Sequence, residues 1–419
     1  MNFSELVTSN GLFCDGDWIE KKDQDPNGAV RLIQLADIGV CEFKDKSNRF
    51  ITEAKAEELR CTYLQKGDIL IARLPEPLGR ACIFPLDGKY ITAVDVAIVR
   101  ISGNDVNSKY IMYMVNSPGF RIDIKQYESG TTRKRISRKN LDKIDFEIPS
   151  LAEQNRIVAR IEELFSELDH GVETLQKTKQ QLAVYRQAVL KQAFEGHFTN
   201  HEDFQIELEW ASEDETSKLP KIPSEWRYVA LSKLGDLGRG KSKHRPRNDA
   251  KLFEGGKYPF IQTGDVKAAK RYITEYNKMY GEFGLQQSKL WPKGTLCITI
   301  AANIAETAFL GIDACFPDSV VGFTPFEFFS SEYVKHFIES QKLRLWAFAP
   351  ATAQKNINLD TLENLIIPYC SLGEQKSVVA EIESRMTICD NIEKTVDTAL
   401  QQTEAMRQSI LKQAFEGGL

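Results

Sequence analysis

The sequence predicts an α+β protein made of two similar halves, each a mixed α/β domain followed by one long helix. The main observation is a repeat: Leu190–Gly196 (LKQAFEG) returns residue for residue as Leu411–Gly417. In the wider windows Arg186–Gly196 and Arg407–Gly417, nine of eleven positions are identical. The second observation is a long helical pattern of apolar residues that ends in each copy of this segment. A tandem duplication with a period of 221 residues explains both observations.

The composition is that of an ordinary globular protein of two to four domains, with 42% apolar and 27% charged residues in a chain of 419. The first residues, MNFSELVTSNG, lack the basic and apolar regions of a secretory signal. No apolar run approaches the roughly 18 residues of a membrane span. The eight cysteines form no C-x-x-C pair, and the five histidines do not cluster with them. We therefore expect a cytoplasmic protein with reduced thiols and without a zinc site, a cofactor or a membrane partner.

The first domain is expected at residues 1–149 and ends in a strongly basic segment. Apolar runs separated by turn residues predict strands at Val30–Leu35, Asp68–Ala72 and Tyr90–Ile101. The segment Ser129–Lys139 (SGTTRKRISRK) follows, and it holds no acidic residue. Such a run is a candidate contact for the phosphates of a nucleic acid. Its five cations are Arg133, Lys134, Arg135, Arg138 and Lys139.

The first long helix is expected at residues 150–198. Ser150 and Glu153 fit an S-x-x-E capping box, which satisfies the free amides at a helix start. Gly196 is a natural terminator. An apolar stripe over about five heptads predicts a coiled coil, because such a stripe needs a partner helix. The stripe consists of Ile161, Leu168, Leu175, Leu182 and Val189.

The second half repeats this plan after an acidic segment, residues 199–220, which we expect to be a solvated linker. A second domain is expected at 221–369 and a second long helix at 370–419, where Ser371 and Glu374 repeat the capping box. Identity is high between the ends of the helices and low between the domains. The helices therefore share one constrained task, whereas the domains differ in what they contact. The stripe of the second helix includes Ile382, Val396 and Ile410.

The segment Gly235–Ser242 matches the phosphate-binding loop G-x-x-x-x-G-K-[ST] letter by letter. That loop needs a helix directly after it, but Pro246 stands where the helix should continue. We therefore favour a contact with the DNA backbone over nucleotide binding, with a solvated surface loop as the remaining alternative. The cations of this region are Arg239, Lys241, Lys243, Arg245 and Arg247.

Signatures of catalysis are missing, so we expect that the chain is not an enzyme. It has no Asn-Pro-Pro-Tyr-like motif of methyl transfer, no G-x-G-x-x-G loop, no serine elbow and no H-E-x-x-H pair. The aromatic residues within Val321–Phe329 are expected in the core rather than in a platform that stacks on bases.

Both long helices begin with L-x-E-Q, at Leu151–Gln154 and at Leu372–Gln375, and both end with Q-A-F-E-G. With these motifs and the segments Phe253–Val266 and Lys355–Leu362, the chain resembles the DNA specificity subunits of type I restriction-modification enzymes over its whole length. The resemblance implies that each α/β domain is a target recognition domain. It also implies that the two long helices form an antiparallel coiled coil that separates these domains. Methyltransferase subunits and a motor-nuclease (restriction) subunit are the partners that the resemblance implies.

The predicted function is sequence-specific recognition of a bipartite, asymmetric site in double-stranded DNA, with the helix pair setting an unread gap near one helical turn. Lys355 and Asn356 stand where Lys134 and Arg135 stand in the first copy, so they join the expected DNA-binding residues. A coiled-coil scaffold or adaptor without DNA readout is the main alternative. An NTPase based on Gly235–Ser242 is a third possibility.

Overall fold

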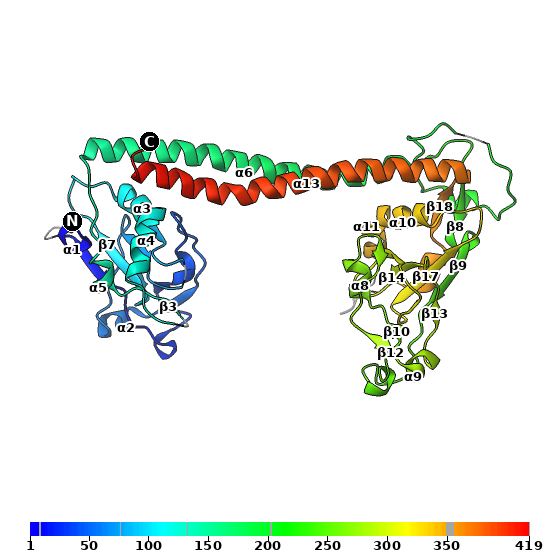
Figure 1. The fold of residues 1–419 in the computed structure, drawn as a ribbon, viewed down its shortest axis with the longest axis horizontal. Coiled ribbons are helices and arrows are strands. Elements are labelled where there is room, and N and C mark those ends of the chain that lie inside the picture. The colour runs from blue at the N-terminus through cyan, green and yellow to red at the C-terminus, as the bar shows by residue number, and fades with distance from the viewer. Residues whose placement is uncertain (8–9, 76, 132, 202, 349–355, 419) are drawn as a thin grey trace. The chain divides into compact units, whose positions relative to one another are not determined.

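The computed structural model describes the chain except for residues 8–9, 76, 132, 202, 349–355 and 419. The chain divides into two compact units (Figure 1). Unit 1 comprises Met1–Lys177 and Val396–Leu419, and unit 2 comprises Thr178–Thr395. Each unit therefore holds one α/β domain, the start of one long helix and the end of the other.

The α/β domain of unit 1 is built on two sheets. A four-stranded antiparallel sheet has the order β1-β7-β4-β5. A three-stranded sheet has the order β3-β2-β6, in which β2 and β6 are parallel. All four side chains of the central strand β4 are buried, as its continuous apolar sequence ILIA predicts. The strands are β1 Leu12–Asp15, β2 Val30–Ile33, β3 Arg49–Ile51, β4 Ile69–Ala72, β5 Ala81–Ile83, β6 Tyr90–Thr92 and β7 Val96–Arg100.

Short helices surround these sheets, and α3 contributes most to the core of unit 1. Asn107 caps the start of α3 by accepting a hydrogen bond from the amide of Lys109, and the helix ends before Pro118. Every residue of α3 from Tyr110 to Asn116 is buried. The helices are α1 Phe3–Leu6, α2 Glu53–Glu58, α3 Ser108–Asn116, α4 Pro118–Gln126 and α5 Arg138–Leu141, with 3-10 turns at Lys21–Asp23 and Leu35–Asp37.

The α/β domain of unit 2 is built on a five-stranded mixed sheet of order β11-β15-β14-β17-β9. Three two-stranded sheets, β10/β12, β13/β16 and β8/β18, complete it. The strands are β8 Arg227–Ala230, β9 Gly235–Arg239, β10 Tyr258–Pro259, β11 Tyr272–Ile273, β12 Met279–Tyr280, β13 Leu290–Trp291, β14 Leu296–Thr299, β15 Thr307–Leu310, β16 Ala314–Cys315, β17 Val320–Pro325 and β18 Ile366–Tyr369. The helices are α7 Glu213–Thr216, α8 Thr263–Ala268, α9 Glu282–Gln286, α10 Ser331–Ser340, α11 Lys342–Phe348 and α12 Leu359–Glu363, with 3-10 turns at Leu231–Lys233 and Ala250–Leu252.

The duplication extends to single hydrogen bonds. The amide of Ile136 donates to the carbonyl oxygen of Arg73, the residue after β4, at 3.1 Å. In unit 2 the amide of Ile357 donates to the carbonyl oxygen of Ile300, the residue after β14, at 2.9 Å. The same backbone contact thus ties each segment before α5 or α12 to the end of a central strand.

The two long helices are α6 Leu151–Phe194 and α13 Leu372–Phe415. In each unit they pack together and run antiparallel (Figure 1). Ion pairs join them, Asp169 to Arg407 in unit 1 and Arg186 to Asp390 in unit 2. The predicted fold class, two mixed α/β domains with two long paired helices, is confirmed.

The expected stripe residues are buried mainly where an α/β domain covers the helices. Ile161 lies in the core of unit 1, and Val189 and Ile382 lie in the core of unit 2. Val396 is also buried, and Ile410 is half-buried against the core of unit 1. The middle of the stripe on α6 is only half-buried, because two helices alone leave part of their contact open to water. Its residues are Leu168, Leu175 and Leu182.

The expectation of a solvated linker at 199–220 is wrong for one face of that segment. Phe204, Ile206, Leu208 and Trp210 alternate with exposed polar residues and pack against the core of unit 2. The ring of Phe204 lies 4.9 Å from that of Tyr369. The acidic composition hid this period-two pattern.

Among the described residues, no helix combines the length and the apolar character that crossing a membrane requires.

Candidate nucleic-acid interface

The first basic segment forms a closed loop that presents arginines to solvent. The backbones of Ser129 and Arg135 exchange two hydrogen bonds of 2.9 Å, and Gly130 takes the left-handed conformation that the turn requires, with φ +96°. Arg133, Lys134 and Arg135 are exposed. Lys134 pairs with Glu128 at 2.7 Å. Within the described part of the chain, no ion pair involves Arg133 or Arg135, so both are available to an anionic ligand.

Arg138 has a structural role that the sequence did not indicate. It opens α5, and its guanidinium lies over the ring of Phe13 at 5.4 Å. Its Nε lies 3.4 Å from Asp15 Oδ2, and its Nη1 donates to the carbonyl oxygen of Phe13. Arg73 pairs with the same carboxylate at 3.1 Å. The charge of Arg138 is thus partly balanced within unit 1.

The second basic loop follows β9, and its arginines contact neighbouring backbone or a carboxylate. Arg247 Nη2 donates to both carboxylate oxygens of Asp318, at 3.0 and 2.8 Å. Arg239 Nε donates to the carbonyl oxygen of Asp318 at 3.0 Å. Arg245 donates to the carbonyl oxygen of His244 at 2.9 Å. Asp318 therefore lowers the net positive charge of this loop.

Lys241 and Lys243 are the exposed lysines of this loop, and a hydrogen bond from a neighbour or to one fixes the backbone of each. The hydroxyl of Ser288 donates to the carbonyl oxygen of Lys241 at 2.8 Å. The amide of Lys243 donates to the carbonyl oxygen of Gln287 at 3.2 Å. A fixed backbone with exposed ammonium groups suits contact with phosphates, which act on lysine as a point charge.

The nucleotide-binding interpretation of Gly235–Ser242 fails on the local structure. Gly235–Arg239 is itself the strand β9, and no helix follows before the short turn at Ala250–Leu252. A phosphate-binding loop needs the N-terminus of such a helix. The glycines serve packing instead: a Cβ on Gly238 would lie 2.8 Å from the ring of Trp291. The match to the motif is a coincidence of a tightly packed edge strand.

Asn356 of unit 2 corresponds to Arg135 of unit 1, and it lies beside a strained loop that the sequence did not predict. Lys355 lies outside the described residues, whereas Asn356 is exposed and pairs through its backbone with Ala301. The loop that begins at Ala301 holds Ala302 and Ala305 at φ of 63° and 61°, a conformation that residues with a Cβ rarely adopt. No sequence signal predicts the strain at this loop. Strained backbone of this kind is concentrated at functional sites in proteins.

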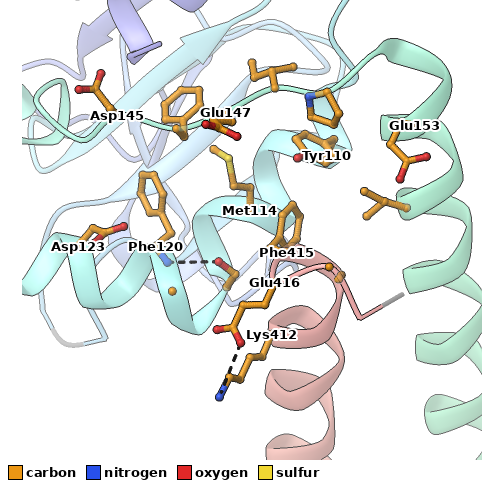
Figure 2. A pocket seen from close by; sticks show the side chains of 18 residues that line it. Tyr110, Met114, Phe120, Asp123, Asp145, Glu147, Glu153, Lys412, Phe415 and Glu416 are labelled. Atoms are coloured by element: carbon orange, nitrogen blue, oxygen red, sulfur yellow. Dashed lines mark hydrogen bonds and ion pairs between the residues drawn. The ribbon is translucent and has the colours of Figure 1, made fainter.

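An acid-lined pocket of about 520 Å³ in unit 1 marks a surface unsuited to DNA. Figure 2 shows carboxylates from several elements around it, among them Asp123, Asp145, Glu147 and Glu153. A polyanion is repelled by such a group of carboxylates.

Comparison with known proteins decides the family. A profile described as "Type I restriction modification DNA specificity domain" matches residues 14–180 and 223–402. The chain belongs to this family. It is a specificity subunit, the non-catalytic component that reads the DNA target of a type I restriction-modification system. The resemblance expected from the sequence is confirmed.

Curated relatives support this assignment, and solved structures share the fold. The chain is 26% identical over 337 residues to the type I restriction enzyme EcoBI specificity subunit of Escherichia coli, covering 77% of this chain and 68% of that one. It is 24% identical over 332 residues to the StySPI specificity subunit of Salmonella potsdam, of which it covers 66%. The HsdS subunit from Thermoanaerobacter tengcongensis shares the fold, with a TM-score of 0.58 at 16% identity and coverage of 99% and 98%. A chain from work on complex assembly and conformational transition of a type I R-M system aligns with a TM-score of 0.70 at 16% identity and coverage of 99% of both chains.

Proposed function

We propose that this specificity subunit reads a bipartite, asymmetric site in double-stranded DNA, one half with each α/β domain. The observation that carries this proposal is the pattern of divergence. The two domains have the same layout but different surfaces, whereas the helix ends that join them are nearly identical in sequence. Different surfaces on equivalent frames suit two different half-sites.

The exposed cations of the two basic loops are the proposed backbone contacts. Arg133 and Arg135 serve the first domain, and Lys241 and Lys243 serve the second. Phosphate contacts of this kind position a protein on the duplex, whereas base contacts specify the sequence. Lys134 and Arg138 in the first domain, and Arg239, Arg245, Arg247, Lys355 and Asn356 in the second, remain proposed members of the same surfaces. Asp318 must release or share Arg247 for that arginine to bind phosphate.

We propose that the helix pair acts as a spacer between the two readers. A helix rises 1.5 Å per residue, so its length sets a distance that a flexible linker cannot. Half-sites about one helical turn of DNA apart, roughly 34–36 Å, lie on the same face of the duplex. The proposed boundaries of the readers are residues 1–149 and 221–369.

The proposed partners are methyltransferase subunits and motor-nuclease restriction subunits, in the cytoplasm. The relatives are named as subunits of type I restriction enzymes, which supports this assembly. The rival proposal is a coiled-coil adaptor without DNA readout. It would explain the helix pair, but it gives no reason for two diverged basic loops.

Methylation-sensitive sequencing of the source genome tests the proposal. The gene that encodes this chain is deleted and then restored on a plasmid. Restoration should return adenine methylation at one bipartite motif, and co-purification should recover the methyltransferase. Methylation that is independent of the subunit would contradict the proposed function.

A further inference from the structure

We propose that Gln154 and Gln375 are positioning residues that fix each recognition domain on the paired helices. Loss of either one is then expected to relax the gap between the half-sites that the protein accepts. This inference rests on the proposed spacer role of the helix pair. It assigns a physical task to the repeated L-x-E-Q motif.

Gln154 joins the start of α6 to the start of α3 in unit 1. Its side chain is fully buried, with 0% exposed. Its Oε1 accepts a hydrogen bond of 2.8 Å from the amide of Asn107, the residue that caps α3. Its Nε2 donates to the carbonyl oxygens of Asp105 at 3.2 Å and Pro149 at 2.9 Å. One amide group thus satisfies one donor and two acceptors of the buried backbone.

Gln375 makes the equivalent contacts in unit 2. Its side chain is also 0% exposed. Its Oε1 accepts a hydrogen bond of 2.9 Å from the amide of Ser330, the residue that caps α10. Its Nε2 donates to the carbonyl oxygen of Cys370 at 2.9 Å. The cap residues differ, Asn107 and Ser330, but the glutamine contact is the same because it uses only backbone groups.

The repeated Q-A-F-E-G motif also contacts α3 and α10. In unit 1 the ring of Phe415 at the end of α13 lies 5.2 Å from that of Tyr110 in α3, and Figure 2 shows the two side chains beside each other. In unit 2 the ring of Phe194 at the end of α6 lies 5.0 Å from that of Tyr333 and 5.1 Å from that of Phe337 in α10. The two repeated motifs are thus two parts of one joint, which antiparallel packing brings together in each unit.

The joint connects the helix pair to the sheet that carries each reader. α3 packs on β5, and α10 packs on β15 and β17. Only glutamine offers an acceptor and two donors at this reach, since glutamate lacks the donors and leucine lacks both. A joint of fixed hydrogen bonds permits fewer orientations than one made of apolar contacts alone, because hydrogen bonds are directional.

The test compares gap discrimination, with the chain in complex with its methyltransferase subunits. The probes are duplexes that carry both half-sites of the motif found by sequencing, with the gap unchanged, one base pair longer or one shorter. The variants are Gln154→Leu and Gln375→Leu. The matched controls are Ala159→Leu and Ala380→Leu, exposed positions on the same helices that are related by the same repeat.

Each glutamine variant should discriminate between the native and altered gaps about tenfold less than the wild type, because the loss of buried hydrogen bonds loosens the joint. The bases preferred within each half-site should not change, and both controls should behave like the wild type. Should a glutamine variant fail to fold, Phe415→Leu and Phe194→Leu loosen the same two joints and keep an apolar core. Undiminished discrimination in folded variants overturns the proposal. A wild type that accepts all gaps equally overturns the spacer role as well.

Discussion

At the residue scale, the two basic loops differ in how freely their cations can meet a phosphate. Arg133 and Arg135 are exposed and unpaired within the described chain, whereas Arg138 and Arg247 already contact carboxylates. Exposed ion pairs are worth little to stability. The pairing of Arg247 with Asp318 is therefore weak enough to be exchanged for a phosphate, although the exchange leaves the carboxylate of Asp318 without this arginine.

The first prediction concerns Arg133 and Arg135. Replacing both with glutamine should weaken DNA binding and reduce the slope of log affinity against log salt by roughly one unit for each phosphate that the variant no longer binds. Arg138→Gln is a comparison variant that should also lower thermal stability, because the guanidinium that packs on Phe13 and pairs with Asp15 is removed. Parallel salt titrations for the wild type and the double variant would place the DNA face elsewhere.

The second prediction concerns Asp17, whose carboxylate accepts a hydrogen bond of 3.0 Å from the amide of Thr62. Burial raises the pKa of Asp17 from 3.8 to about 6. The folded state therefore binds the proton of the Asp17 carboxyl more tightly than the unfolded state. The free energy that this protonation contributes to folding is lost as pH rises from about 4 to 6. At pH 8 the wild type must keep a charged carboxylate in this half-buried position, whereas Asp17→Asn is neutral. Because water screens a half-buried charge, Asp17→Asn should be more stable than the wild type by only about 1 kcal/mol.

Denaturant unfolding at pH 4, 6 and 8 measures this difference. The advantage of Asp17→Asn should shrink toward zero at pH 4, where the wild-type carboxyl is protonated in the folded state. A constant difference across this range would contradict the assigned titration.

At the scale of the element, the long helices show what the sequence predicts well. Gly196 and Gly417 end the helices as expected, with φ of +82° and +84°. The hydroxyls of Ser150 and Ser371 cap the starts at 3.4 and 3.1 Å. The carboxylates of Glu153 and Glu374 accept from Arg156 and Trp226, so the described residues show only the serine half of each expected capping box. These features depend on residues within one or two turns, so sequence spacing is enough to find them.

Contacts between distant residues could not be predicted in this way. Arg138 meets Asp15 across 123 residues, and no sequence pattern links the two. The period-two alternation from Phe204 to Trp210 was visible but was outweighed by its acidic neighbours. The candidate site was therefore proposed from charge alone, whereas the contacts of each cation needed the tertiary structure.

The third prediction distinguishes the covered ends of the helix pair from its half-buried middle. Ile161→Asp should cost several kcal/mol, because a carboxylate would lie in a core position with 0% exposure. Leu175→Asp should cost roughly 1 kcal/mol, because the half-buried side chain keeps access to water. Gln176→Asp is the exposed control. Circular dichroism melts measure the order of the three, and equal melting curves for all would show that the stripe faces water.

At the scale of the whole molecule, the fourth prediction tests the spacer. Four residues, about one helical turn, are inserted in α6 after Lys177 and in α13 after Thr395, where each helix passes between units. The double insertion should lengthen the preferred gap and leave both half-sites unchanged. A single insertion should instead destabilise the protein, because it shifts one helix past the ion pairs of the other. A changed half-site with an unchanged gap would refute the spacer role.

One chain is proposed to carry two separate readers of duplex DNA. A hydroxyl-radical footprint of the methyltransferase complex on its motif tests this proposal. Two short protected blocks are expected, separated by an unprotected gap near one helical turn, and protection of the first block should be reduced when Arg133 and Arg135 are replaced by glutamine. A single continuous block in the wild type, or an unchanged first block in that variant, would contradict the proposal.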